Sequence, residues 1–353
     1  MALISKKKIP VKISKALKKY LKAYDREVDV PIQYSDLLRY ENAIPLYDSS
    51  GADTLWETVY YAQSDMQEVN LALKTVYAVL KADGDLRVME HLTVDRIDLC
   101  TYGNTQPFRV RIVNQINDNF DYFYVKHADA SRIYGLELEH LLSPNRINYH
   151  VQGNTLIEEH IIGIPGDAFI KYHLNHEKLN EIRLAKEFVK FNERCFVRLL
   201  GDMHSSNFVV DVTPDFEEVT YRLKSIDFDQ QSYEGRKNIY LPQYFKQNNP
   251  LIALGLKHMT PETVRQYRKE ERTLIGKRIK AEKDRVDELL AAMTTDTLST
   301  EKRIKQLRVE LAKYYQESAF LECRNMGEIV KLSMWMVLEK PQLYDDDFMS
   351  SEE

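Results

Sequence analysis

Two short segments of the chain combine residue types that bind metal ions and move protons. LGDMHSSN (200–207) holds Asp202, His204 and Asn207, and SIDFDQQ, twenty residues later, holds Asp227. Carboxylate and amide oxygens are the ligands that Mg²⁺ prefers, whereas zinc sites are built mainly from Cys and His. A carboxylate can also orient and deprotonate an attacking hydroxyl. The combination is typical of magnesium-dependent phosphate chemistry.

A predicted β-hairpin joins these two segments. NFVVDV and TYRLKSIDF are rich in β-branched and aromatic residues, as strands are. Because a hairpin returns the chain to its starting point, we expect it to bring Asp227 next to Asp202 and Asn207. The structural alternative for the first segment alone is a turn in which Asp and Asn satisfy backbone donors and His204 is a buried, hydrogen-bonded side chain.

The order Asp-x-x-x-x-Asn, hairpin, Ile-Asp-Phe resembles the catalytic signature of the protein-kinase-like superfamily. The loop Gly-Asp-x-His-x-x-Asn is most similar to those of the aminoglycoside and choline phosphotransferases, and also resembles those of the phosphatidylinositol kinases. The resemblance implies an ATP- and Mg²⁺-dependent kinase in which Asp202 is the catalytic base. Asn207 and Asp227 would be metal ligands, and His204 would position the loop.

The resemblance extends to a strand that would hold the nucleotide. FYVKHA is similar to the third strand of the small kinase lobe, which implies that Lys126 contacts the α- and β-phosphates. Its partner should be a glutamate on the next helix, where Glu137 and Glu139 are available. Glu137 lies nearer the apolar stripe of that helix and is preferred, although its spacing from Lys126 is shorter than usual.

TLIEEHIIGIPGD resembles the strand, hinge and glycine-bearing joint between the two lobes of small-molecule kinases. The resemblance implies that the backbone around Glu159, His160 and Ile161 meets the edge of the adenine ring. The whole resemblance covers roughly residues 90–245. The segments before and after it match no pattern of known function.

Two features depart from the family pattern. No GxGxxG stands in the first predicted hairpin, where only YGNTQ (102–106) could cover phosphates. Asp229 takes the position of the glycine in Asp-Phe-Gly, where it could bind a second metal ion or cap the following turn. A catalytically inactive, kinase-like nucleotide-binding module therefore remains an alternative. A metallophosphoesterase is a weaker one, because its later Gly-Asn-His-Asp and Gly-His-x-His motifs are missing.

The pattern of apolar and β-branched residues along the chain predicts an α+β fold. Helical spacing marks residues 54–82, and a three-stranded antiparallel meander is expected over about 91–128. A short helix and two more strands follow, and mainly helices lie beyond GIPGD. With the resemblance, this implies a bilobal kinase-like fold: a helical extension with a basic arm at 1–85, a small-sheet lobe at 86–162 and a helical lobe at 163–353.

Composition narrows the class of protein. The 353 residues are 44% hydrophobic and 29% charged, as in ordinary globular proteins. No apolar run approaches the roughly eighteen residues of a membrane span, and the start MALISKKKIP lacks the apolar stretch of a secretory signal. The three cysteines lie far apart, which fits neither a disulfide framework nor a CxxC metal site. We expect a cytoplasmic protein with structural thiols.

Charge is unevenly distributed along the chain. The net charge of −5 argues against a nucleic-acid partner, yet residues 1–22 carry eight lysines and no acid. This basic arm is either a solvated helix or a segment that meets an anionic partner. The catalytic loop and hinge favour a small hydroxylated molecule as phosphoacceptor, while a lipid head group or a protein remains open.

Overall fold

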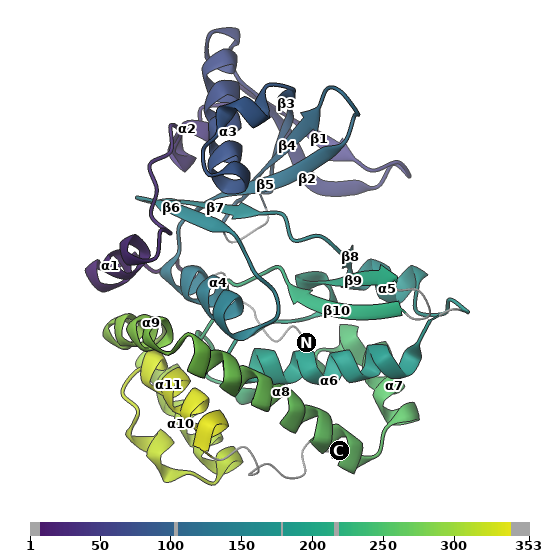
Figure 1. Cartoon of the computed structure of the whole chain (residues 1–353), viewed down its shortest axis with the longest axis vertical. Helices are drawn as coiled ribbons and strands as arrows, with labels where there is room; N and C mark the ends of the chain where they lie inside the picture. The colour runs from purple at the N-terminus through teal and green to yellow at the C-terminus, as the bar shows by residue number, and fades with distance from the viewer. Residues whose placement is uncertain (1–7, 102–104, 178, 215–218, 340–353) are drawn as a thin grey trace. The chain divides into compact units, whose positions relative to one another are not determined.

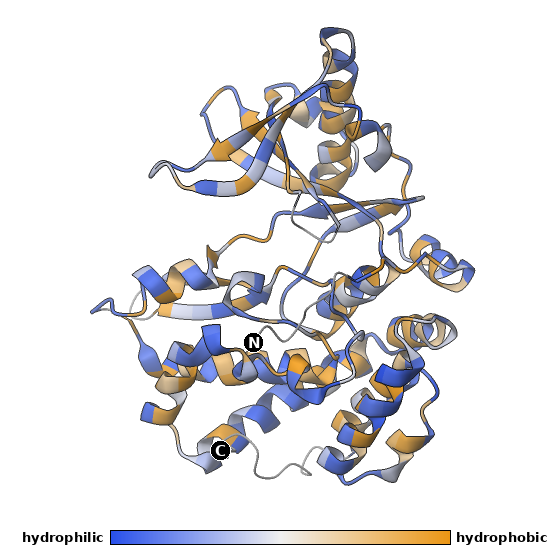
Figure 2. Cartoon of the chain, turned by 180° about the vertical axis from the view of Figure 1, so that it is seen from behind, coloured by the Kyte–Doolittle hydropathy of each residue, from blue (hydrophilic) through white to orange (hydrophobic). Residues whose placement is uncertain are grey.

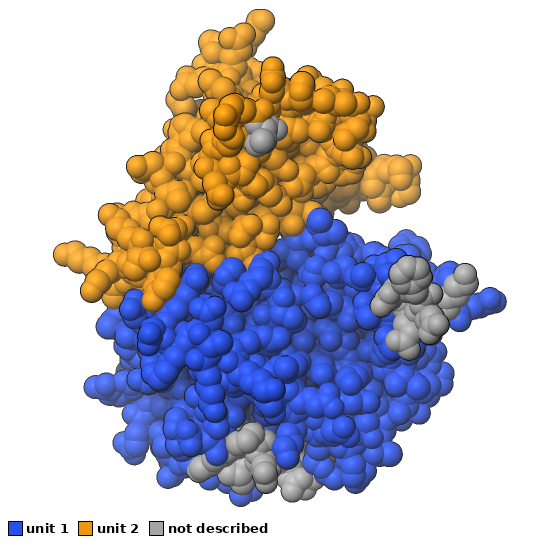
Figure 3. Space-filling view, in the orientation of Figure 1, with its two compact units in different colours: residues 1–6, 131–146, 161–353 blue, residues 7–130, 147–160 orange. Residues whose placement is uncertain are grey.

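The computed structural model describes residues 8–101, 105–177, 179–214 and 219–339. The chain divides into two compact units, coloured separately in Figure 3. Within the described ranges, unit 1 consists of residues 131–146 and 161–339, and unit 2 of residues 8–130 and 147–160. No helix in these ranges has both the length and the apolar composition needed to cross a membrane.

Unit 2 is built on a seven-stranded sheet in which every neighbouring pair of strands is antiparallel, in the order β1-β2-β3-β4-β5-β7-β6 (Figure 1). This sheet, together with the helices of the chain, confirms the predicted α+β class. The strands are β1 (Asn42–Tyr47), β2 (Asp53–Tyr60), β3 (Leu92–Leu99), β4 (Phe108–Asn114), β5 (Phe120–His127), β6 (Tyr149–Gln152) and β7 (Thr155–Glu159).

The helix predicted over residues 54–82 is wrong in its first part. β2 runs to Tyr60, and the helix α3 covers only Gln63–Ala82. DTLWETVY is dense in β-branched and aromatic residues, and its pairing with β1 overrides the helical spacing. Because β1 and β2 continue the sheet, residues 42–60 belong to it and not to a separate helical extension.

The core of unit 2 lies between α3 and one face of the sheet. Leu73 and Val76 of α3 are buried in one cluster with Ile97, Phe108 and Phe123 from the strands. Burying an aliphatic or aromatic side chain of this size contributes about 1.5–3 kcal/mol. The remaining helical segments of unit 2 are α1 (Lys15–Ala23), α2 (Tyr34–Leu37) and the 3₁₀ turn η1 (Leu86–Met89).

Unit 1 combines a small sheet with most of the helices. The sheet has the order β10-β9-β8, and β9 pairs with β10 along its whole length, which confirms the predicted hairpin. Its strands are β8 (Ile164–Pro165), β9 (Phe208–Pro214) and β10 (Val219–Ser225). Its helices are α4 (Ala130–Leu142), α5 (Gly166–Tyr172), α6 (Glu181–Val197), α7 (Asn249–His258), α8 (Pro261–Ala281), α9 (Lys283–Thr295), α10 (Glu301–Tyr315) and α11 (Met326–Glu339).

Short 3₁₀ turns connect these elements. They are η2 (Ser205–Asn207), η3 (Lys237–Tyr240), η4 (Pro242–Tyr244), η5 (Lys246–Asn248) and η6 (Ser318–Glu322). The helices are amphipathic: α10 buries Ile304, Leu307 and Leu311, three and four residues apart, among charged neighbours. Figure 2 shows the resulting mixture of hydrophobic and hydrophilic residues along the helices of unit 1.

Helix α4 belongs to unit 1 from residue 131, although the sequence suggested that it packs with the small sheet. It is buried along almost its whole length, including Tyr134 and Leu138. Two charged side chains of α4 pair with basic residues of the same unit: Glu137 with Arg285 of α9, and Glu139 with Arg198. The chain passes from unit 2 into unit 1 for the last time between residues 160 and 161.

Candidate functional site

The hairpin joins the two motif segments at its open end. β9 begins directly after Asn207, and its first residue, Phe208, pairs with Ser225 at the end of β10. The backbone N–H of Ile226 then donates to the carbonyl oxygen of Asn207 at 3.0 Å. Asp227 is therefore held one residue beyond a hydrogen bond to Asn207, as the sequence predicted.

The loop that carries Asp202 is fixed by its backbone. The Asp202 N–H donates to the carbonyl oxygen of Ile239 at 3.0 Å, and the Asn207 side-chain amide donates to the Asp202 carbonyl oxygen at 2.8 Å. Asp202 has a φ of 63°, and Leu199 and Ser232 nearby also have positive φ. Such conformations cost about 1–3 kcal/mol each for residues other than glycine and cluster at functional sites.

The carboxyl group of Asp202 lies in a negative, partly dehydrated environment. Burial, followed by the charges of Asp227, Glu234 and Asp229, raises the pKa of Asp202 to about 7. A carboxyl group that titrates near neutrality can accept a proton and release it again under physiological conditions. A bound cation would offset the same negative charges and hold the pKa lower.

His204 lies at the start of η2 and shapes the loop. Its Nδ1 accepts the backbone N–H of Ser206 at 3.3 Å, and its ring lies 6.1 Å from the ring of Phe245 between centroids. Burial lowers the pKa of His204, while the charges of Asp227 and Asp167 act in the opposite direction. A neutral imidazole that accepts a backbone hydrogen bond fits the positioning role inferred from the loop.

Arg132 of α4 reaches the second motif segment. One of its terminal nitrogens, Nη1, lies 2.9 Å from Asp227 Oδ1 and 2.8 Å from Asp229 Oδ1. The backbone N–H of Asp229 donates to the same oxygen of Asp227 at 3.0 Å. The Asp229 side chain is thus an ion-pair partner of a buried arginine, an arrangement that neither of its two predicted roles included.

The donors of the loop and hairpin suit a magnesium ion. The nitrogen of the Asn207 amide donates to the Asp202 carbonyl, which leaves the amide oxygen as the atom that can meet a cation. The described ranges contain no group of three or more His, Cys, Asp or Glu residues that could cage a metal. Magnesium usually binds through one or two carboxylates together with substrate phosphates and waters, so Asn207 and Asp227 fit that chemistry.

Lys126 has an acidic partner on the neighbouring strand. Its Nζ lies 2.7 Å from Oε2 of Glu158, and both side chains are buried in unit 2. In the β5–β7 ladder, Tyr124 lies opposite Glu158 and Lys126 lies opposite Leu156. All four side chains therefore share one face of the sheet. Glu137, the partner expected from the sequence, lies in unit 1 and pairs with Arg285 at 2.9 Å. The kinase-like pattern places the partner of Lys126 on the following helix, whereas in the structure it lies on the neighbouring strand β7.

Two of the three predicted hinge residues, Glu159 and His160, make hydrogen bonds within unit 2. The Glu159 N–H donates to the carbonyl oxygen of Asn148 at 3.1 Å, and its carboxylate accepts the Asn148 N–H at 2.7 Å. His160 Nδ1 lies 3.1 Å from the hydroxyl of Tyr124, and burial lowers the His160 pKa. The backbone N–H of Glu159 is thus already paired within the sheet. Ile161 is the first residue of unit 1 at this crossing.

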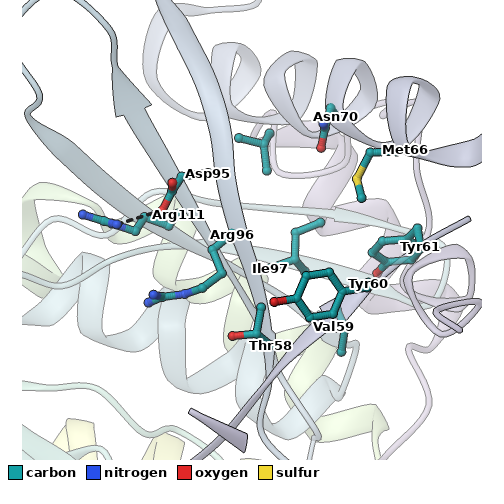
Figure 4. A pocket seen from close by; sticks show the side chains of 11 residues that line it. Thr58, Val59, Tyr60, Tyr61, Met66, Asn70, Asp95, Arg96, Ile97 and Arg111 are labelled. Carbon is teal, nitrogen blue, oxygen red and sulfur yellow. Dashed lines mark hydrogen bonds and ion pairs between the residues drawn. The ribbon is translucent and has the colours of Figure 1, made fainter. Parts of the chain in front are cut away.

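A cavity of about 420 Å³ in unit 2 contains none of the predicted site residues (Figure 4). It opens between β2, β3 and α3, where β2 and β3 pair only through Glu57–Thr58 and Asp98–Leu99. Arg111, which lines the cavity, pairs with Asp95 at 2.8 Å. The residues that line this cavity include none from the loop or the hairpin.

Part of the basic arm and of the predicted phosphate-covering loop falls outside the described ranges, namely residues 1–7 and 102–104. Lys8 is buried and pairs with Asp129 at 2.7 Å, so this lysine is a structural residue and not a solvated one. The lysines of α1 are exposed, as either alternative for the arm requires; they are Lys15, Lys18, Lys19 and Lys22.

The residues that sequence reasoning missed are charged groups of buried elements. Arg132 is the clearest case, since ASRIYGLELEHLL has apolar residues on most sides and its charges therefore need buried partners. That signal was present in the sequence. Glu234, which helps to raise the pKa of Asp202, carries no comparable signal because it lies in a segment without helix or strand.

Neither models of known protein families nor curated proteins match this chain in sequence.

Proposed function

We propose that the protein is an ATP- and Mg²⁺-dependent phosphotransferase that transfers the γ-phosphate to a hydroxyl group, most readily that of a small molecule. The observation that carries the proposal is the hydrogen bond between Ile226 and Asn207, which keeps Asp227 beside the loop of Asp202. The order of these residues and the hairpin between them match the kinase-like signature over the catalytic segment. Any kinase-like arrangement of the two units is part of the proposal.

Asp202 is the base in this proposal. Its half-buried carboxyl group has a pKa near neutrality, and its backbone is held on both sides by hydrogen bonds, which fixes the direction of the side chain. It would orient the acceptor hydroxyl and take its proton as the new bond to phosphorus forms. His204 keeps the loop in shape by accepting the Ser206 N–H.

Asn207 and Asp227 would hold the metal ion. When bound, Mg²⁺ supplies positive charge that neutralises the phosphate oxygens of the nucleotide. The resemblance alone assigns the α- and β-phosphates to Lys126, whose ammonium group pairs with Glu158 at 2.7 Å. It also assigns the adenine edge to the backbone of Glu159, His160 and Ile161, of which the Glu159 N–H already donates to the Asn148 carbonyl oxygen.

A nucleotide-binding module without turnover is the second candidate. Two observations favour it: Arg132 already pairs with Asp227, and the N–H of Glu159 is used within the sheet. Both could weaken metal or nucleotide binding. A metallophosphoesterase is not proposed, because its metal-binding histidine motifs are missing from the sequence.

The decisive experiment compares Asp202→Asn with wild type in two assays. Removing a general base typically lowers turnover by about 10²–10⁴-fold. We expect that loss in phosphate transfer to a metabolite pool, and in slow ATP hydrolysis, with ATP affinity changed by no more than a few-fold. Asp211→Asn makes the same chemical change on β9, where Asp211 pairs with Lys224, and serves as the control. Full activity in Asp202→Asn contradicts the proposed role.

A further inference from the structure

Arg132 is buried at the centre of the acidic segment. It is 2% exposed, and its Nη1 contacts Asp227 Oδ1 and Asp229 Oδ1 at 2.9 and 2.8 Å. Its Nη2 donates to the carbonyl oxygen of Ile226 at 3.4 Å, and the guanidinium carbon lies 5.8 Å from the centre of the Phe228 ring. The arginine is thus held by the same stretch of chain that carries the proposed metal ligand.

The two carboxylates that Arg132 bridges differ in their access to water. The Asp229 side chain is 9% exposed, whereas that of Asp227 is 36% exposed. A buried charge that loses its partner is strongly destabilised, so the pair with Asp229 is the permanent one. Asp227 can exchange its partner at much lower cost, because water solvates whichever group is released.

A single guanidinium nitrogen of Arg132 lies within 3 Å of both carboxylate oxygens, so one positive charge serves both acids. Two cations cannot share Asp227 Oδ1 without strong repulsion, since a monovalent and a divalent charge about 4–5 Å apart repel each other even at an effective dielectric constant of about 20. The arginine and a metal ion therefore compete for this oxygen.

We propose that Arg132 is an internal counter-ion that holds Asp227 in the metal-free protein and sets the affinity of the site for a divalent cation. The proposal rests on the function proposed above and adds a regulatory property to it. The Asp227 carboxylate passes from the arginine to the metal when the phosphates of a nucleotide add their negative charge, while Asp229 keeps Arg132 in place. The site then takes up a metal–nucleotide complex in preference to the free metal.

The experiment measures Mn²⁺ binding to the full chain by electron paramagnetic resonance, with Mn²⁺ as the probe for Mg²⁺ and without any turnover. Arg132→Gln removes the competing charge, and we expect its affinity for free Mn²⁺ to rise by about ten-fold or more over wild type. Arg285→Gln is the matched control, because Arg285 also pairs with a buried acid of unit 1, Glu137, away from Asp227. Its Mn²⁺ affinity should equal that of wild type.

The outcomes separate this inference from the proposed function. Equal or weaker Mn²⁺ binding by Arg132→Gln, with wild type binding measurably, overturns the role of Arg132 and leaves the proposed metal site standing. If no form binds Mn²⁺, with or without ATP, the metal site and the inference fail together. Tight binding by Arg132→Gln alone supports both.

A second measurement covers the case in which Arg132→Gln does not fold. The guanidinium ¹⁵N resonances of Arg132, assigned by comparison with Arg132→Lys, are followed in the wild-type protein. A non-hydrolysable ATP analogue with Mg²⁺ should change them, because the contact with Asp227 is lost, and the analogue without metal should change them much less. Identical spectra in both conditions would contradict the exchange.

Discussion

The backbone N–H of Ile226 lies 3.0 Å from the carbonyl oxygen of Asn207, and this bond closes the hairpin on the side of the acidic residues. Asp227 follows Asn207 by twenty positions in the sequence, but Asn207 directly precedes β9 and Asp227 lies two residues beyond the end of β10. The relationship depends only on the pairing of β9 with β10, which is continuous from Phe208 to Pro214. The site is thus assembled from local structure.

Mg²⁺–ATP should stabilise the folded protein by mass action. A ligand at 100 times its dissociation constant adds about 2.7 kcal/mol, which raises the melting temperature by several degrees. In Asp227→Ala the part of the shift that depends on Mg²⁺ should vanish, while Arg132 keeps Asp229 as its partner and the variant stays folded. Differential scanning calorimetry with ATP, with and without Mg²⁺, measures both effects. No shift at millimolar Mg²⁺–ATP would rule out both kinase-like candidates.

Asp202 should make the protein less stable at high pH. Its folded-state pKa is about 7, well above the usual value of about 3.9, so the folded state holds the extra proton between these limits. The contribution of Asp202 to the free energy of unfolding is therefore fully present below about pH 4 and is lost as the pH rises through 7. Asp202→Asn should therefore melt several degrees higher than wild type at pH 8 and at nearly the same temperature near pH 4.

The control for this comparison is Asp211→Asn, which makes the same chemical change on β9, where the half-buried Asp211 pairs with Lys224 at 2.7 Å. Melting curves of the three proteins at several pH values give the result directly. A constant difference between Asp202→Asn and wild type across pH 4–8 would show that the carboxyl group titrates normally.

Glu137 should behave as a structural residue. It is buried and pairs with Arg285 at 2.9 Å, and breaking a buried pair by removing one charge costs about 3 kcal/mol. Glu137→Gln should lower the free energy of unfolding by about that amount, with ATP affinity unchanged in the folded fraction. Glu288→Gln, an exposed change on the same helix as Arg285, should have little effect in urea titration. A selective loss of ATP affinity in Glu137→Gln would restore the role expected from the sequence.

Lys126 and Glu158 should contribute jointly to nucleotide binding. If Lys126 contacts phosphates, Glu158→Gln should weaken ATP binding by loosening the ammonium group, and the effects of Lys126→Met and Glu158→Gln should not add in the double variant. Isothermal titration calorimetry with Mg²⁺–ATP measures the coupling. Additive effects, or an ATP affinity that neither substitution changes, would argue that the pair only stabilises β5 and β7.

The sequence predicts the parts of the structure that depend on neighbours along the chain. The pairing of Phe208–Pro214 with Val219–Ser225 follows from two nearby segments rich in β-branched residues, and that alone brings Asp227 to Asn207. The spacing of apolar residues in the segment 53–60 suits a helix, but the segment forms β2 because it pairs with β1, whose sequence NAIPLY has no clear strand pattern.

Partners set by tertiary structure could not be read from the sequence. Which acid meets Lys126 depends on the register of β5 against β7, and which charge meets Asp227 depends on how α4 packs within unit 1. The α4 sequence shows that its charges must be buried with partners, but it does not show that Arg132 would meet the acidic segment and Glu137 the helix α9.

The assignment of residues 131–146 to unit 1 has a consequence for synthesis of the chain. Every residue of unit 2 has left the ribosome once position 160 has emerged, so its sheet can close early, with α4 as an insertion between β5 and β6. The unit 1 residues that contact α4, among them Arg198, Arg285 and Asp296, are made only later. A nascent chain of this length exposes a hydrophobic helix, which is the kind of surface that chaperones bind.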